Sequence, residues 1–221
     1  MKANFKQLES KMLKSESIED LCSDIETGKF GKLEMPGFKE AFRGIARKAY
    51  MELRYDEVVD DTETTLALCR LISTMTETFN DRNGAIAFLN ELAFNNADFA
   101  DLIFLASYAS EPIGDHRIRL KVLLKAKDLM STFEEAVTLA NELLKTNLGY
   151  TPDTIPLDVI ISNIKLAKTS DDFLKAAEIC LKSNRVDLAQ KFFAKALAKA
   201  SSPKEKTKIR NSIKKDFGYA I

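Results

Sequence analysis

The densest group of side chains that could perform acid–base or metal chemistry lies between positions 56 and 63. Its members are Asp56, Glu57, Asp60, Asp61 and Glu63. Neighbouring carboxylates can transfer protons or hold Ca²⁺, but the alternating Asp-x-Asp-x-Asp-Gly order of a calcium loop is missing. Acidic residues also favour the positive end of a helix dipole. We therefore interpret this cluster as the solvated start of a helix.

Other chemically versatile residues are few and scattered. His116 is the only histidine, and a single imidazole without a Cys/His cluster does not make a zinc site, so we expect it at the surface. Cys22, Cys69 and Cys180 lie 47 and 111 residues apart, which offers neither a disulfide framework nor a zinc knuckle. We predict that all three are small core residues in a reducing compartment.

Recognised catalytic motifs are missing as well. The sequence has no glycine-rich phosphate loop of the Walker or dinucleotide type and no Gly-x-Ser-x-Gly elbow. We therefore predict no catalytic residue, no metal and no cofactor, and we do not expect an enzyme.

Charge is distributed unevenly along a chain whose 33 basic and 33 acidic residues cancel. The segment from Glu52 to Asp115 holds 13 acidic and 3 basic residues, a net charge of −10. The segment from Lys182 to Lys215 holds 11 basic and 2 acidic residues, a net charge of +9. Such a basic segment attracts an acidic protein, a nucleic acid or an anionic lipid.

Eight residues of this basic segment are the candidate partner-binding residues. Three are spaced by four and fall on one side of a helix, roughly opposite Phe193, where they face solvent. The eight are Lys191, Lys195, Lys199, Lys206, Lys208, Arg210, Lys214 and Lys215. A lysine-coated surface that only keeps the protein in solution is the alternative interpretation.

The elements that position these residues are predicted to be helices, because apolar residues recur at spacings of three and four behind capping signals. Helices are expected at about 17–27 and 38–55, from Asp60 or Asp61, and from about 84, 97, 115, 133, 156, 171, 186 and 203. Asn83-Gly84 is expected to break the chain.

Two helix starts carry the pattern of a capping box. The first pairs Ser131 with Glu134. The second pairs Ser202 with Glu205 and has Pro203 in the first helical position.

From about 84 to 203, helix starts follow one another every 17 residues on average, so a helical hairpin recurs about every 34. The sequence therefore predicts an all-α fold of antiparallel helical hairpins stacked as a short α-solenoid, with a compact helical bundle as the alternative. Residues 1–37 are expected to form an N-terminal helix and loop, loosely attached. Residues 38–221 form a helical-repeat-like domain that ends in a terminal helix at 203–217.

One hairpin, residues 170–203, resembles a tetratricopeptide repeat. In that family small, aromatic and small residues follow one another on the second helix, which lets the two helices approach closely. The matching positions are Ala189, Phe193 and Ala196 on the second helix, Phe173 and Ala177 on the first, and Asn184 in the turn. The departures are Ala176 in place of leucine, Cys180 in place of an aromatic residue, and Pro203 two residues late. The resemblance implies that Ala189 is buried where the helices cross.

The sequence favours a noncatalytic protein–protein interaction module, an adaptor or scaffold that presents hairpin grooves and a basic C-terminal face to a protein or peptide partner. A nucleic-acid-binding protein is the first alternative, although 24 lysines against 9 arginines provide few groups for base readout. An all-helical enzyme with a carboxylate-based site is the second.

We expect no membrane span, because the longest run without a charged residue, Leu102–Ser110, has nine residues and a spanning helix needs about 20. Charged residues near the start also leave no apolar signal-peptide core. A cytoplasmic protein is expected.

Overall fold

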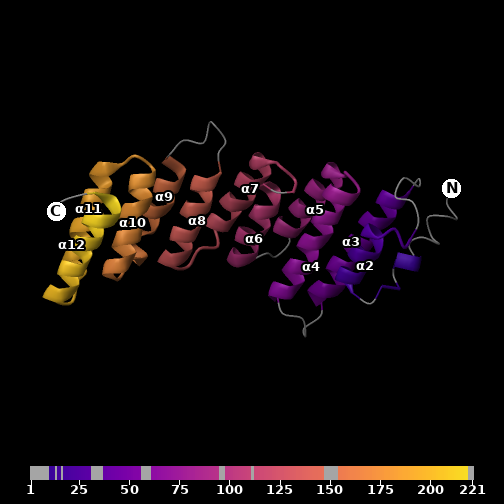
Figure 1. Ribbon diagram of the computed structural model, residues 1–221, viewed down its shortest axis with the longest axis horizontal. Coiled ribbons are helices and arrows are strands. Elements are labelled where there is room, and N and C mark those ends of the chain that lie inside the picture. Colours follow the sequence, from indigo (N-terminus) through magenta and orange to yellow (C-terminus); the bar gives the residue numbers. More distant parts are fainter. Residues whose placement is uncertain are drawn as a thin grey trace. The chain divides into compact units, whose positions relative to one another are not determined.

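The computed structural model is built from helices (Figure 1). It describes residues 10–12, 14–15, 17–30, 37–55, 61–94, 98–110, 112–146 and 154–218, with side chains throughout except at 50–55, 61–65, 68, 110 and 216–217. Every regular element in these ranges is a helix, and none is a strand. The predicted all-α class is therefore confirmed.

The helices begin close to the predicted starts. The earlier ones are α2 (Ile18–Glu26), α3 (Phe38–Tyr55), α4 (Asp61–Ser73), the π-helical turn η1 (Thr74–Thr78), α5 (Arg82–Phe94), α6 (Phe99–Ser110) and α7 (His116–Lys127). The later ones are α8 (Phe133–Lys145), α9 (Thr154–Asn163), the 3₁₀ turn η2 (Ile164–Leu166), α10 (Ser170–Lys182), α11 (Val186–Lys199) and α12 (Pro203–Phe217). None of the helices in the described ranges has the length and apolar character that a membrane span needs.

Packing divides the chain into two compact units, residues 1–122 and 123–221. The sequence instead placed a boundary after residue 37. Helix α2 buries Leu21, Cys22 and Ile25 and packs against α4 and η1 within the first unit. The loose attachment of residues 1–37 as a whole stays a prediction.

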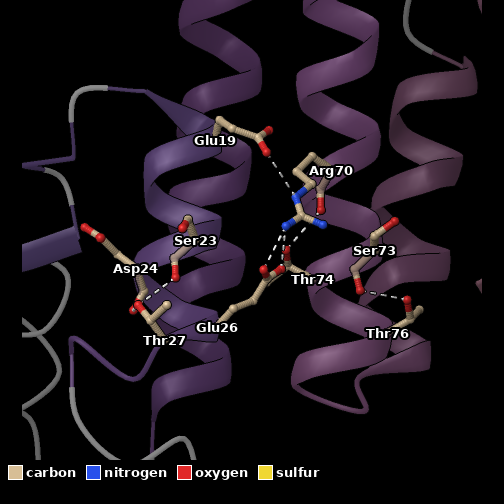
Figure 2. Close-up of polar contacts among 9 residues, drawn as sticks. All are labelled: Glu19, Ser23, Asp24, Glu26, Thr27, Arg70, Ser73, Thr74 and Thr76. Atoms are coloured by element: carbon tan, nitrogen blue, oxygen red, sulfur yellow. Dashed lines mark hydrogen bonds and ion pairs between the residues drawn. The ribbon is translucent and has the colours of Figure 1, made fainter.

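In the first unit, an arginine of α4 fastens α2 (Figure 2). The Arg70 Nη2 donates a hydrogen bond to Glu26 at 2.8 Å, and the Arg70 Nε lies 3.7 Å from a Glu19 carboxylate oxygen. Both carboxylates lie on the face of α2 that also carries Cys22, because the three residues are spaced by three and four. Burial raises the pKa of the Cys22 thiol to about 11, and the Thr74 hydroxyl of η1 donates to the Arg70 carbonyl oxygen at 3.1 Å. Arg70 therefore links α4 to both carboxylates of α2.

The break between α4 and α5 lies before the predicted Asn83-Gly84, so that prediction is wrong. The chain turns at Asn80, whose φ is 48°, and Asp81 accepts a hydrogen bond from the Gly84 backbone N–H at 3.1 Å in the first turn of α5. Arg43 of α3 donates two hydrogen bonds to the same Asp81 carboxylate, which holds its pKa below the usual range. A Cβ on Gly84 would lie 2.2 Å from Asp81 Oδ2. The glycine is needed for this close approach.

In the second unit, each helix packs mainly on helices one or two places along the chain. Helix α8 packs on α9 and α10, α10 packs on α9 and α11, and α11 packs on α12. Stacked hairpins produce this order, and the packing fits both a solenoid and a helical bundle.

Small residues let α10 and α11 pack closely. Ala177 of α10 and Ala189 and Ala196 of α11 are fully buried, as is Phe193 between the two alanines of α11. Asn184 takes a left-handed conformation with φ of 57° in the turn that joins the helices. The predicted burial of Ala189 is therefore confirmed, while membership of the repeat family stays a prediction.

The capping box of α8 lies one residue beyond the predicted pair of Ser131 and Glu134. Thr132 is the N-cap, its hydroxyl accepts from the Glu135 N–H at 3.2 Å, and the Glu135 carboxylate accepts from the Thr132 N–H at 2.8 Å. The same carboxylate also accepts from the Ser131 N–H at 2.6 Å. Both registers satisfy the sequence pattern of a box, so the pattern alone does not separate them.

The substitution Gly84→Ala should destabilise the first unit, because the new methyl group displaces the Asp81 carboxylate from Arg43. We expect a loss of about 1 to 3 kcal/mol in the free energy of unfolding, measured by urea denaturation. Asn83→Ala, at the exposed neighbouring position, is the matched control and should change little. A Gly84→Ala protein as stable as the parent would contradict the close approach.

The substitution Ala189→Leu should overpack the crossing of α10 and α11 and cost about 1 to 3 kcal/mol. Ala198→Leu places the same side chain on the exposed side of α11 and should be nearly neutral. Thermal melts of both variants test this difference. If the two variants melt within a degree of each other, Ala189 does not lie at a close crossing.

Candidate partner-binding surface

All eight candidate residues lie on the last two helices of the second unit, α11 and α12 (Figure 1), and all eight are exposed. We call them the C-terminal basic surface. On α11, Lys191, Lys195 and Lys199 are spaced by four, and on α12 Lys206, Arg210 and Lys214 repeat this spacing. Four residues of helix rise about 6 Å, so each row sets its cations about 6 Å apart along the helix.

These cations differ from the lysines of the neighbouring helix α10, which form ion pairs with carboxylates of the same unit. Lys175 lies 2.7 Å from a Glu134 carboxylate oxygen, and Lys182 lies 2.8 Å from one of Glu178. Among the side chains that the structure describes, none of the eight residues of the C-terminal basic surface forms an ion pair. Lys208 contributes to the lowered pKa of Glu205, and the other seven charges have no ion-pair partner among the described residues.

The charge asymmetry follows the division into units. Residues 1–122 contain 16 basic and 21 acidic residues, a net charge of −5. Residues 123–221 contain 17 basic and 12 acidic residues, a net charge of +5. The excess of positive charge in the second unit lies at its end, on α11 and α12.

Lys195, in the middle of the α11 row, is positioned by two aromatic rings. Its Nζ lies 5.6 Å from the ring centroid of Phe192 and 5.8 Å from that of Phe173, and the two rings stack at 6.5 Å. A cation over an aromatic ring contributes about 0.5 to 1 kcal/mol at exposed sites. The sequence predicted an exposed lysine here but not this contact, because Phe173 comes from α10.

Helix α12 is held on the second unit by its first turn. As predicted, Ser202 is the N-cap and Pro203 the first helical residue, and the Ser202 hydroxyl accepts from the Glu205 N–H at 3.2 Å. The Glu205 carboxylate does not complete the predicted box: it accepts from the Ser201 N–H at 2.7 Å and from the Ser170 hydroxyl of α10 at 2.7 Å. Glu205 thereby links α12 to α10.

The hydrogen bonds to Glu205 stabilise its charged form. The Ser201 hydroxyl donates at 2.6 Å and has the largest effect, followed by Ser170, and together with the Ser201 N–H they lower the pKa of Glu205 to about 2. On its other side, α12 buries Ile209 and Ile213, as their spacing predicted. The basic residues of α12 therefore stand on an anchored helix.

Among the remaining sequence candidates, those whose side chains the structure describes form no competing site. His116 is exposed at the start of α7, as expected, and Cys22, Cys69 and Cys180 are buried with thiol pKa values raised by burial, to about 11 for Cys22 and Cys180. Residues 56–60 and the side chains of Asp61 and Glu63 lie outside the described residues. In the part of the chain that is described, no three His, Cys, Asp or Glu side chains gather as a metal site would require.

Two of the hollows that described residues line lie in the first unit, and both have linings of mixed charge. One, of about 340 Å³, has Lys11 and Lys14 beside Asp20 among its lining residues. The other, of about 400 Å³, has Arg43 beside Glu40. Because cations and carboxylates stand together in each hollow, neither favours one class of charged ligand.

Comparison with protein-family models, with curated proteins and with solved structures gives no match.

The substitution Glu205→Gln should weaken the attachment of α12 and lower the melting temperature at pH 7. The folded pKa of about 2 lies below the ordinary value of 4.5, so the stabilisation is complete above about pH 4.5 and is lost as the pH falls toward 2. Melting curves between pH 7 and pH 2 should therefore show the parent and the variant converging in acid. Glu178→Gln, which removes only an exposed ion pair with Lys182, is the control, and a constant gap between parent and Glu205→Gln would contradict the anchoring role.

Proposed function

We propose that the chain is a noncatalytic protein–protein interaction module, an adaptor or scaffold, that binds an acidic partner protein through the C-terminal basic surface. One observation carries the proposal: eight exposed cations share two packed helices and, among the described side chains, form no ion pair, whereas both lysines of α10 do. The lysines of the α11 row stand about 6 Å apart along the helix and repel one another, and an acidic surface laid over them relieves this repulsion.

An acidic protein suits this surface better than a nucleic acid. Seven of the eight cations are lysines and one is Arg210. Lysine is a point charge on a flexible stem, whereas base readout and bidentate phosphate contacts rely on the guanidinium fork. Nucleic acid is therefore the outcome that the experiment must separate from an acidic protein.

The α10–α11 hairpin supports the scaffold part of the proposal. We propose that it is a tetratricopeptide-like repeat, since Ala177, Ala189 and Ala196 are buried and Asn184 lies in the turn where the repeat pattern needs them. Three free and buried thiols support the reducing environment of the cytoplasm as the place where the protein acts.

The triple variant Lys191→Glu, Lys195→Glu, Lys199→Glu tests the proposal on the native partner, isolated with the full chain from native cells. We expect binding to weaken at least about tenfold, since attraction becomes repulsion. The parent complex should also weaken between 0.15 M and 1 M salt, where the screening length falls from about 8 Å to about 3 Å. Loss of the contacts of Lys195 with the rings should cost only about 0.5 to 1 kcal/mol of stability.

The matched control is Lys127→Glu, Lys165→Glu, Lys168→Glu, which changes the charge of the second unit equally at exposed positions outside α11 and α12. It should bind like the parent. Unaltered affinity and salt response in the α11 variant would show that the basic surface only keeps the protein in solution. A high ratio of absorbance at 260 nm to that at 280 nm in the purified parent, lost after nuclease treatment, would indicate nucleic acid instead.

A further inference from the structure

Helix α11 presents an exposed face that its packing partners leave free. Val186, Gln190, Ala194 and Ala198 are spaced by four, so they form one stripe along the helix, and all four are exposed. Helix α12 packs on α11, yet this stripe stays open to solvent. Ala194 and Ala198 of this stripe have only methyl side chains, which let another backbone approach closely.

The lysine row of α11 runs beside this stripe. Each of Lys191, Lys195 and Lys199 follows directly after a stripe residue, so the row lies one residue further round the helix. The central cation, Lys195, is already positioned over Phe192 and Phe173, which reduces the side-chain freedom that binding would remove. One face of α11 therefore combines an exposed stripe that ends in two alanines with a flanking row that begins at Asp187, which is paired with Arg185, and continues in three lysines.

This combination fits one kind of partner. From it we infer that α11 docks an amphipathic acidic helix of the partner protein, an inference that rests on the proposed function. Two helices packed through small residues approach to about 8 Å. At that distance carboxylates at i, i+4 and i+8 of the incoming helix repeat about every 6 Å, the same rise that separates the three lysines. The apolar residues beside those carboxylates then lie on Ala194 and Ala198.

Charge complementarity selects this occupant over a second copy of α11 or an apolar helix. The α11 helix of a second copy would place its own three lysines against the three lysines of this helix, and the like charges would repel. An apolar helix would leave the positive charge of the lysine row without a counter-charge. An acidic amphipathic helix covers the stripe with its apolar residues and, at the same time, pairs its carboxylates with the three lysines.

Two synthetic, alanine-rich peptides of about 20 residues, long enough to be helical in water, test the inference. Both contain the same residues. In the patterned peptide, glutamates stand at i, i+4 and i+8 with leucines directly beside them, and in the shuffled peptide these residues are spread around the helix. Fluorescence anisotropy with the full chain should show the patterned peptide binding about tenfold tighter or more.

Substitutions on the two parts of the face complete the test. Ala194→Trp places a bulky ring on the exposed stripe and should abolish the preference for the patterned peptide, whereas Ala100→Trp, at an exposed alanine of α6, should not. The triple lysine reversal should abolish binding of both peptides. Circular dichroism confirms that each variant keeps its helices.

Equal binding of the two peptides, or indifference to Ala194→Trp, would overturn the inference. If the triple lysine reversal still abolished binding of the native partner, the proposed function would hold, but the partner would not dock an acidic helix. If a single-stranded oligonucleotide bound more tightly than either peptide and competed with the native partner, both proposals would fail.

Discussion

The second unit depends on close helix crossings through small buried residues. Ala177, Ala189 and Ala196 are fully buried and let α10 and α11 approach closely, and Phe192 of α11 stacks on Phe173 of α10. A helix packed in this way buries only one stripe, and α12, which buries Ile209 and Ile213, also packs on α11. The rest of α11 is left to solvent. Because the buried stripes of α11 are narrow, the side of the helix that carries the three lysines stays exposed.

The same geometry decides which charges are neutralised inside the fold. Lysines of α10 lie near carboxylates of their own helix and of α8, as Lys175 does near Asp171 and Glu134. The lysine row of α11 does not meet a described carboxylate at ion-pair distance; its central member lies over aromatic rings instead. Glu205 is the acidic residue of the first turn of α12, and its carboxylate accepts hydrogen bonds from Ser201 and Ser170. Positive charge consequently accumulates at the end of the unit.

Helix periodicity made most of this fold predictable, because each helix repeats its apolar residues at three and four over a dozen residues or more. Local signals within a single turn were less reliable. Thr132 and Glu135 satisfy the capping pattern as well as Ser131 and Glu134 do, and only the register of the whole helix chooses between them. Asn83-Gly84 has the composition of a turn, yet Gly84 serves the approach of Asp81 to Arg43, which comes from another helix.

Contacts between helices were not predictable from the sequence either, because they join residues that are far apart in the chain. Exposure of the eight basic residues followed from their spacing, but the rings beneath Lys195 and the hydroxyl of Ser170 beside Glu205 depend on which helices pack together. The burial of Ala189, which the resemblance to a tetratricopeptide hairpin implied, is confirmed, but Ala176, a departure from the repeat pattern, is buried as well. It said nothing about the outer face of α11, where no repeat pattern constrains the residues.

The most direct test of the central claim is amine-labelling mass spectrometry of the full chain, free and in complex with its native partner. Acetylation of each lysine reports whether its ammonium is covered. The proposed function predicts strong protection of Lys191, Lys195 and Lys199 in the complex and unchanged labelling of Lys165 and Lys168, which are exposed outside α11 and α12. Unchanged labelling of the α11 row, with protection elsewhere, would contradict a binding role for the C-terminal basic surface.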